Sequence, residues 1–180
     1  MKTLLRLMAA LLCVLATCAA PVADFSLEKM AGKWYTPGFA TNAAWFVNHK
    51  DKMKTGVVMI KNTDDGHMDL SYSNPKADDS CWRMTQLANK TETPGRFTFF
   101  SQVWNNDNDM SIVDVVYDQY ALISTIKTRD GVSDVLTNLY SRTPEPSADI
   151  QEKFTKLSTD AGINPENIAI LPFTGECPDA

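Results

Sequence analysis

Apolar and polar positions alternate along most of the chain between Trp34 and Arg142, and turn residues separate the alternating segments. Residues 67–73 are the clearest case, because an apolar side chain at every second position gives a strand one buried face. Asp64-Asp65-Gly66 and Arg129-Asp130-Gly131 have the composition of hairpin turns. The pattern predicts eight strands, at residues 34–40, 53–61, 67–73, 81–87, 96–103, 111–117, 120–128 and 132–140.

Short connections join most of these strands, and the longer polar stretches at residues 89–95 and 105–109 are expected to be loops. Sequential strands joined by hairpins are typical of an up-and-down antiparallel β-barrel, which leaves no free sheet edge. We therefore expect an all-β fold, an eight-stranded up-and-down antiparallel barrel. A barrel of this size is either filled by side chains or holds one small ligand, and the alternation alone leaves both open.

The period of the pattern changes after Pro146, where a C-terminal α-helix is expected. Ser147 is a suitable N-cap, and Gly162 suits the end of the helix. Residues 168–171 predict a short ninth strand. The apolar face of the helix is formed by residues at intervals of four, three and four: Ile150, Phe154, Leu157 and Ala161.

The first 19 residues have the three parts of a secretory signal peptide. Lys2 and Arg6 come first, an apolar run follows over residues 7–16, and small residues precede a cleavage site after Ala19. A lipoprotein signal ending at Cys18 fits less well, because Thr17 precedes the cysteine. We expect a secreted, extracellular protein whose residues 20–180 form one domain, a length sufficient for its own core.

Charge and cysteine usage narrow the classes of partner. The chain carries 17 Lys and Arg against 22 Asp and Glu, and loss of the leader makes it more acidic, which argues against nucleic acid as a partner. No later apolar run reaches the ~20 residues of a membrane span.

Two cysteines remain after the leader, Cys81 and Cys177, and in an oxidising compartment they predict one disulfide. Asn89-Lys90-Thr91 is a sequon, so Asn89 is expected to be glycosylated.

Gly32-Lys33-Trp34 opens the first predicted strand, and Arg142 follows the last long one. If the sheet closes into a barrel, the Arg142 guanidinium can stack on the Trp34 indole, an interaction that contributes roughly 0.5–2 kcal/mol. Gly32, Trp34 and Arg142 are therefore expected to close one end of the barrel. Their predicted role is structural.

These motifs together resemble the lipocalin family. Residues 32–34 and 139–142 match its first and third signatures, and Val115-Val116-Tyr117 stands where the second signature usually has Thr-Asp-Tyr. Residues 38–45, 117–122, 139–143 and 152–155 further resemble the lipocalin-type prostaglandin D synthases, particularly fish proteins of that group. The resemblance implies a secreted carrier that holds a small lipophilic molecule in the barrel cup.

The resemblance to the synthases stops at their catalytic thiol. An ungapped match from Trp45 to Gly66 places Gly56 where those enzymes carry the cysteine, and no cysteine occurs between Cys18 and Cys81. Neither glycine nor an unactivated threonine supplies a thiolate nucleophile. We therefore expect no catalytic residue and a carrier in place of an enzyme. Prostaglandin-H2 D-isomerase activity without the usual thiol is the alternative.

Candidate ligand contacts follow from strand facing and from the resemblance. Trp45 and Trp104 lie in or beside loops. They either flank the open mouth of the barrel and contact the ligand, or simply cover the core. Gly56 and Val58 are expected to point inward, and the other candidates share two strand faces. The expected contacts are Trp45, Gly56, Val58, Phe97, Phe99, Trp104, Leu122 and Ser124.

The expected ligand is a retinoid, a bile pigment, a fatty acid or a prostanoid. A second alternative is a host-defence protein that sequesters siderophores or bacterial amphiphiles, for which Lys61, Arg83, Arg96 and Lys127 are the available strand cations. His49 and His67 are far apart and lack neighbouring ligands, so no metal site is expected. No cofactor is expected, the protein is expected to be a monomer, and a cell-surface receptor is a candidate partner.

Overall fold

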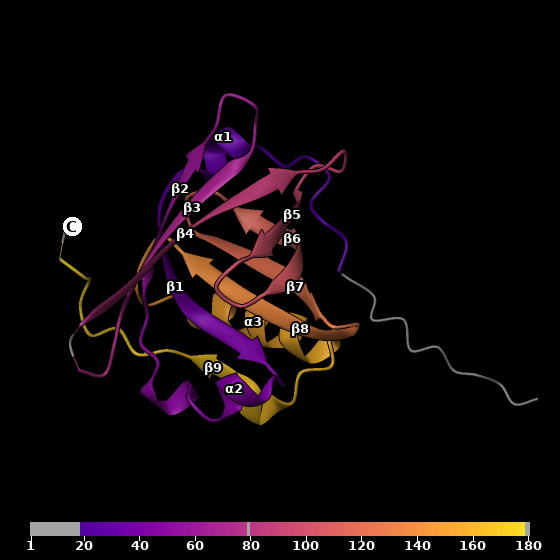
Figure 1. The fold of residues 1–180 in the computed structure, drawn as a ribbon. Coiled ribbons are helices and arrows are strands. Elements are labelled where there is room, and N and C mark those ends of the chain that lie inside the picture. The colour runs from indigo at the N-terminus through magenta and orange to yellow at the C-terminus, as the bar shows by residue number, and fades with distance from the viewer. Residues whose placement is uncertain (1–18, 79, 179–180) are drawn as a thin grey trace, which may run out of the picture.

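The computed structural model describes residues 19–78 and 80–178, and the predicted leader therefore lies outside the described residues except for Ala19. Nine strands and a long C-terminal helix follow one another along the chain (Figure 1). The strands are β1 Gly32–Thr41, β2 Val57–Asn62, β3 Met68–Pro75, β4 Cys81–Lys90, β5 Arg96–Ser101, β6 Asn106–Val116, β7 Tyr120–Arg129, β8 Val132–Ser141 and β9 Ile168–Ile170. The helices are α1 Leu27–Met30, α2 Ala44–Val47 and α3 Ala148–Asp160, with 3-10 turns η1 Lys50–Lys52 and η2 Pro165–Asn167.

The sheet closes on itself. Its order is β2-β3-β4-β5-β6-β7-β8-β1-β9, and antiparallel pairing of β1 with β2 completes the barrel. The expected eight-stranded antiparallel barrel with a C-terminal helix and a ninth strand is therefore confirmed. In Figure 1, α1 lies at one end of the barrel and α2 at the other.

Two predicted loop boundaries are wrong. The stretch at residues 105–109 is mostly strand, because β6 begins at Asn106 and Asp107 already pairs with Phe100 of β5. β4 runs to Lys90, so Asn89 is an exposed residue near the end of a strand. Polar composition suggested loops, but backbone pairing to neighbouring strands satisfies these residues' peptide groups equally well.

The ladder between β4 and β5 is short. It pairs Asn89 with Thr98 and Lys90 with Phe97, at one end of both strands. Toward the other end, Gln86 Nε2 lies 3.5 Å from the Phe100 carbonyl. The barrel wall is therefore closed by backbone pairing near the α1 end and by side chains nearer the α2 end.

Two apolar clusters occupy the inside and the outside of the barrel. The inner cluster includes Trp34, Val58, Ile60 and Phe97, and it fills the half nearest α1. The outer cluster packs Phe154 of α3 against Leu139 and its neighbours on β1, β7 and β8. Only the α2 half of the barrel interior is therefore left for a ligand.

The expected facing of β7 is wrong. Leu122 lies in the outer cluster beneath α3, whereas Ala121 and Ile123 belong to the inner cluster. Ser124 shares the face of Leu122 because side chains alternate along a strand. Leu122 and Ser124 therefore face outward, and burial of both faces of this part of β7 hides the difference from the sequence pattern.

The α1 end is closed by Trp34 and Arg142. The Arg142 guanidinium carbon lies 3.6 Å from the centre of the fully buried Trp34 indole. Arg142 also donates to the carbonyls of Tyr117, Lys33 and Ala31 at 2.9, 2.7 and 3.2 Å, and the indole Nε1 donates to Met30 O at 2.8 Å. A Cβ added to Gly32, whose φ is +102°, would lie 3.4 Å from Arg142 Nη1.

The C-terminal segment returns across the barrel wall and is bonded to it. Cys81 at the start of β4 forms a disulfide with Cys177, with Cα atoms 5.9 Å apart. Thr55 is fixed to the same segment, because its amide donates to Pro172 O at 2.8 Å and its hydroxyl to Leu171 O at 2.7 Å. Of the helices in the described ranges, none has the length and apolarity that crossing a bilayer requires.

Candidate ligand-binding cavity

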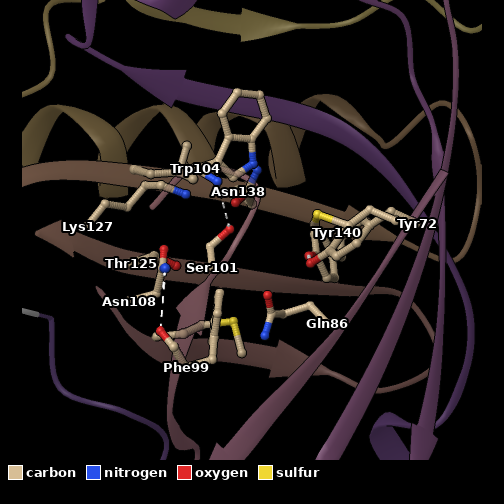
Figure 2. Close-up of a pocket in the computed structure, with 13 residues that line it drawn as sticks. Tyr72, Gln86, Phe99, Ser101, Trp104, Asn108, Thr125, Lys127, Asn138 and Tyr140 are labelled. Atoms are coloured by element: carbon tan, nitrogen blue, oxygen red, sulfur yellow. Dashed lines mark hydrogen bonds between the residues drawn. The ribbon is translucent and has the colours of Figure 1, made fainter. Parts of the chain in front are cut away.

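A cavity lies in the α2 half of the barrel, above the inner cluster (Figure 2). The space is about 470 Å³, with part of its mouth open to solvent included. Its wall combines apolar side chains with uncharged polar ones and a single cation. The lining residues are Tyr72, Met84, Gln86, Phe99, Ser101, Trp104, Asn108, Met110, Thr125, Lys127, Leu136, Asn138 and Tyr140.

Tyr72 and Tyr140 form the floor of this cavity. Their hydroxyl groups lie 2.8 Å apart, and both rings pack on the inner cluster. Burial raises the pKa of the Tyr140 hydroxyl well above its usual range, and proximity to Tyr72 raises it further. Burial likewise raises the pKa of Tyr72. Both phenols are therefore neutral hydrogen-bonding groups at physiological pH.

Aromatic side chains from two loops meet at the mouth. Trp45 of α2 and Trp104 of the β5–β6 turn are stacked, with ring centroids 6.0 Å apart and an interplanar angle of 21°. Phe39 and Phe46 pack against Trp45 with centroids 5.7 and 5.9 Å away. Trp45 and Trp104 are 43% and 47% exposed, so the stacked pair is accessible from solvent.

Lys127 is the one cation among the cavity-lining residues that the structure describes. Burial lowers the pKa of its ammonium group. Within the described ranges, its side chain forms no hydrogen bond or ion pair, although Asp134 is its exposed register partner on β8. Asn108, its partner on β6, also faces the cavity. The sequence indicated Lys127 only as one of four strand cations, and it did not indicate Asn108, because residues 105–109 were expected to be a loop.

The structure separates the predicted contact residues into groups. Phe99 and Trp104 line the cavity, and Trp45 contacts it through Trp104. Val58 and Phe97 point inward but lie in the packed cluster around Trp34. Phe97 also packs edge-on against Phe25 at a centroid distance of 5.7 Å. Gly56 is buried just before β2 and is not among the lining residues.

Asn74 occupies the space that a side chain at position 56 would need. A Cβ added to Gly56 would lie 2.1 Å from Asn74 Oδ1 and 2.6 Å from its Cγ, which is far inside contact distance. The same Oδ1 is buried and lacks a hydrogen-bond partner in the described part of the chain. A side chain at position 56 would therefore have to displace Asn74.

This close approach predicts strong coupling between positions 56 and 74. We expect Gly56→Cys alone to lower the free energy of unfolding by about 1–3 kcal/mol, because a buried side chain must displace Asn74. We expect Asn74→Ala to relieve much of that loss, giving a coupling of about 1 kcal/mol or more in a double-mutant cycle. Urea unfolding of the four proteins measures the coupling. Additive changes would contradict it.

Comparison with known proteins places this barrel in a family. The sequence pattern of the Lipocalin / cytosolic fatty-acid binding protein family matches residues 31–175. The chain belongs to the lipocalin family. A lipocalin from the toad Rhinella marina is 35% identical over 154 residues, which covers 86% of this chain and 84% of that protein.

Other proteins similar to this chain are named for different functions. Prostaglandin-H2 D-isomerase from Felis catus is 31% identical, with 86% of this chain and 81% of that protein covered. Extracellular fatty acid-binding protein from Coturnix japonica is 34% identical, with 98% and 97% covered. A solved structure of the siderocalin Ex-FABP, described as acting "through dual ligand specificities", has a TM-score of 0.71 and 26% identity, with 84% of this chain and 95% of that chain covered.

Proposed function

We propose that this lipocalin is a secreted carrier that holds one small lipophilic molecule, such as a retinoid, a bile pigment, a fatty acid or a prostanoid. The observation that supports the proposal is the cavity between the stacked tryptophans and the Tyr72–Tyr140 floor. Phe99, Met84 and Leu136 supply apolar wall area. Burial of ligand surface there contributes ~25 cal/mol per Å² before the costs of association.

The charges of the barrel favour a lipophile over a siderophore. Of the four strand cations considered for siderophore capture, Lys127 lines the cavity. Lys61 and Arg83 are exposed, and Arg96 forms an ion pair with Asp109 at 2.5 Å on the outside. One internal cation is a weak match for a multiply charged ligand.

Similarity to prostaglandin-H2 D-isomerase favours the isomerase alternative, but the side chains around position 56 do not. Both cysteines in the described part of the chain are joined in the disulfide. The Thr55 hydroxyl beside Gly56 is buried and donates to Leu171 O, so it is not available as a nucleophile. We therefore propose binding without catalysis.

Export is part of the same proposal. We propose that the leader is removed after Ala19 and that the exposed Asn89 carries a glycan. We further propose that the mature protein is a monomer with a cell-surface receptor as a candidate partner. The Cys81–Cys177 disulfide supports this location, since disulfides persist in oxidising compartments.

The carrier proposal predicts quenching of tryptophan fluorescence by lipophiles. Retinoic acid, bilirubin and a long-chain fatty acid are titrated separately into the mature protein. We expect at least one to bind with a dissociation constant near micromolar, about −8 kcal/mol. Trp104 lines the cavity and Trp45 stacks on it, so their emission should report binding.

Trp104→Phe is the matched variant, because it keeps an aromatic ring at the mouth. We expect it to lose part of the quenching, whereas Trp82→Phe on β4 should change it little, since Trp82 is not among the lining residues. Failure of every lipophile to bind at tens of micromolar would contradict the carrier proposal.

A further inference from the structure

Lys127 is a partly buried cation that forms no ion pair with any residue the structure describes, and the other polar groups that line its cavity are neutral. Of the lining residues that the structure describes, none is acidic. Asp134 stands opposite Lys127 on β8 but is exposed at the mouth and forms no ion pair with it. Burial of a charge costs free energy unless the charge is paired or hydrogen-bonded, so an anionic group on a ligand is the partner that this position favours.

Asn108 carries a second unsatisfied group beside this cation. The residue is 3% exposed, and its Nδ2 donates to the side-chain oxygen and the carbonyl of Asn106 at 2.8 and 3.1 Å. Those two acceptors fix the orientation of the amide. Asn108 Oδ1 is consequently a buried acceptor with no partner among the described residues. It needs a donor such as a hydroxyl group, and an unmet acceptor of this kind is costly.

The two groups lie on the same wall. Asn108 and Lys127 are register partners on β6 and β7, so their side chains project from neighbouring positions on one face. Figure 2 shows both on one side of the cavity and the Tyr72–Tyr140 floor on the other. A ligand head group that reaches one of them also reaches the other, while its apolar part lies against Phe99, Met110 and Leu136.

We propose that the cavity selects a monoanionic lipid whose hydroxyl group is close to its carboxylate, a hydroxy fatty acid of the 3-hydroxy type. Lys127 binds the carboxylate and Asn108 Oδ1 accepts the hydroxyl proton. This inference rests on the proposed carrier function and adds the ligand's head-group chemistry to it. Phe99, Met110 and Leu136 contact the hydrocarbon chain of the ligand but do not determine which hydrocarbon chain is bound.

The test compares three probes on the mature protein: 3-hydroxytetradecanoic acid, tetradecanoic acid and the methyl ester of the hydroxy acid. Isothermal titration calorimetry measures each affinity. We expect the hydroxy acid to bind about tenfold more tightly than the plain acid, because it satisfies Asn108 Oδ1. We expect the ester to bind at least tenfold more weakly than the hydroxy acid, because it is uncharged.

Variants assign these differences to residues. Lys127→Met keeps the length of the side chain, and it should remove the preference for the acid over the ester. Asn108→Leu should remove the preference for the hydroxyl while leaving the charge preference. Lys61→Met is the matched control, because Lys61 is an exposed lysine on β2 outside the cavity. It should leave all three affinities within about twofold.

Each outcome separates this inference from the carrier proposal. Equal binding of the hydroxy acid and its ester would overturn the role of Lys127 and leave a carrier without charge selection. Equal binding of the hydroxy acid and the plain acid would overturn the role of Asn108 and with it the selection of a hydroxy acid. Failure of these probes together with retinoic acid and bilirubin would instead overturn the carrier itself. The three-probe comparison on the unmodified protein tests the head-group assignment even if Asn108→Leu does not fold.

Discussion

Replacement of Trp34 by alanine is expected to lower the free energy of unfolding by about 3–5 kcal/mol. The indole is fully buried in the inner cluster, and large-to-small substitutions of buried aromatic residues cost that amount. The change also removes the surface on which Arg142 stacks at 3.6 Å. Urea unfolding followed by far-ultraviolet circular dichroism measures the loss.

Lys33→Ala is the control next to Trp34 in the chain. Lys33 pairs with Glu176 at 2.8 Å, but both side chains are about two-fifths exposed, so the loss should stay below about 1 kcal/mol. The Trp34 variant should still bind lipophiles with affinity within about threefold wherever it is folded, because the cavity begins at the tyrosine floor. A stability loss below about 1 kcal/mol, or a large loss of affinity in the folded variant, would contradict the role of Trp34 in closing the barrel.

Removal of the disulfide has the second large expected effect. The double variant Cys81→Ser/Cys177→Ser should lose about 2–5 kcal/mol, since the bond closes a loop between residues 96 apart in sequence. β4 should be affected most, because it pairs with β5 at two positions only and depends on β3 and on the disulfide. Urea unfolding measures the global change, and amide hydrogen exchange measures the local loss of protection in β4.

The reduced form of the unmodified protein is the natural control for that variant. The two should unfold at the same urea concentration, which separates loss of the bond from any effect of the serines. Amide hydrogen exchange in β7 should rise only as much as the loss in the global free energy of unfolding predicts, because β6 and β8 flank this strand along its whole length. A loss under about 1 kcal/mol, or uniform exchange across all strands, would contradict this account.

The sequence by itself determined the barrel, because its signals are local. Alternation over residues 67–73, hairpin signals such as Asp64-Asp65-Gly66 and the four-three-four spacing of the α3 face each act within a few residues. The pairing of Trp34 with Arg142 also followed from the sequence, once the sheet was assumed to close. Strand ends were not determined by composition, since a polar residue such as Asn108 faces the cavity from within a strand.

Only the tertiary structure decided which residues face the ligand space. Alternation divides β7 into two faces but cannot say which is inside when α3 buries the outer one, and so Leu122 and Ser124 were assigned to the wrong face. Lys127 and Asn108 Oδ1 are candidate ligand contacts because neither has a partner among the residues the structure describes, and that depends on how the strands of the barrel pack. The cover of Gly56 by Asn74 likewise depends on the packing of two strands. Hydrophobic patterning reports burial, and burial does not distinguish a packed core from the wall of a cavity.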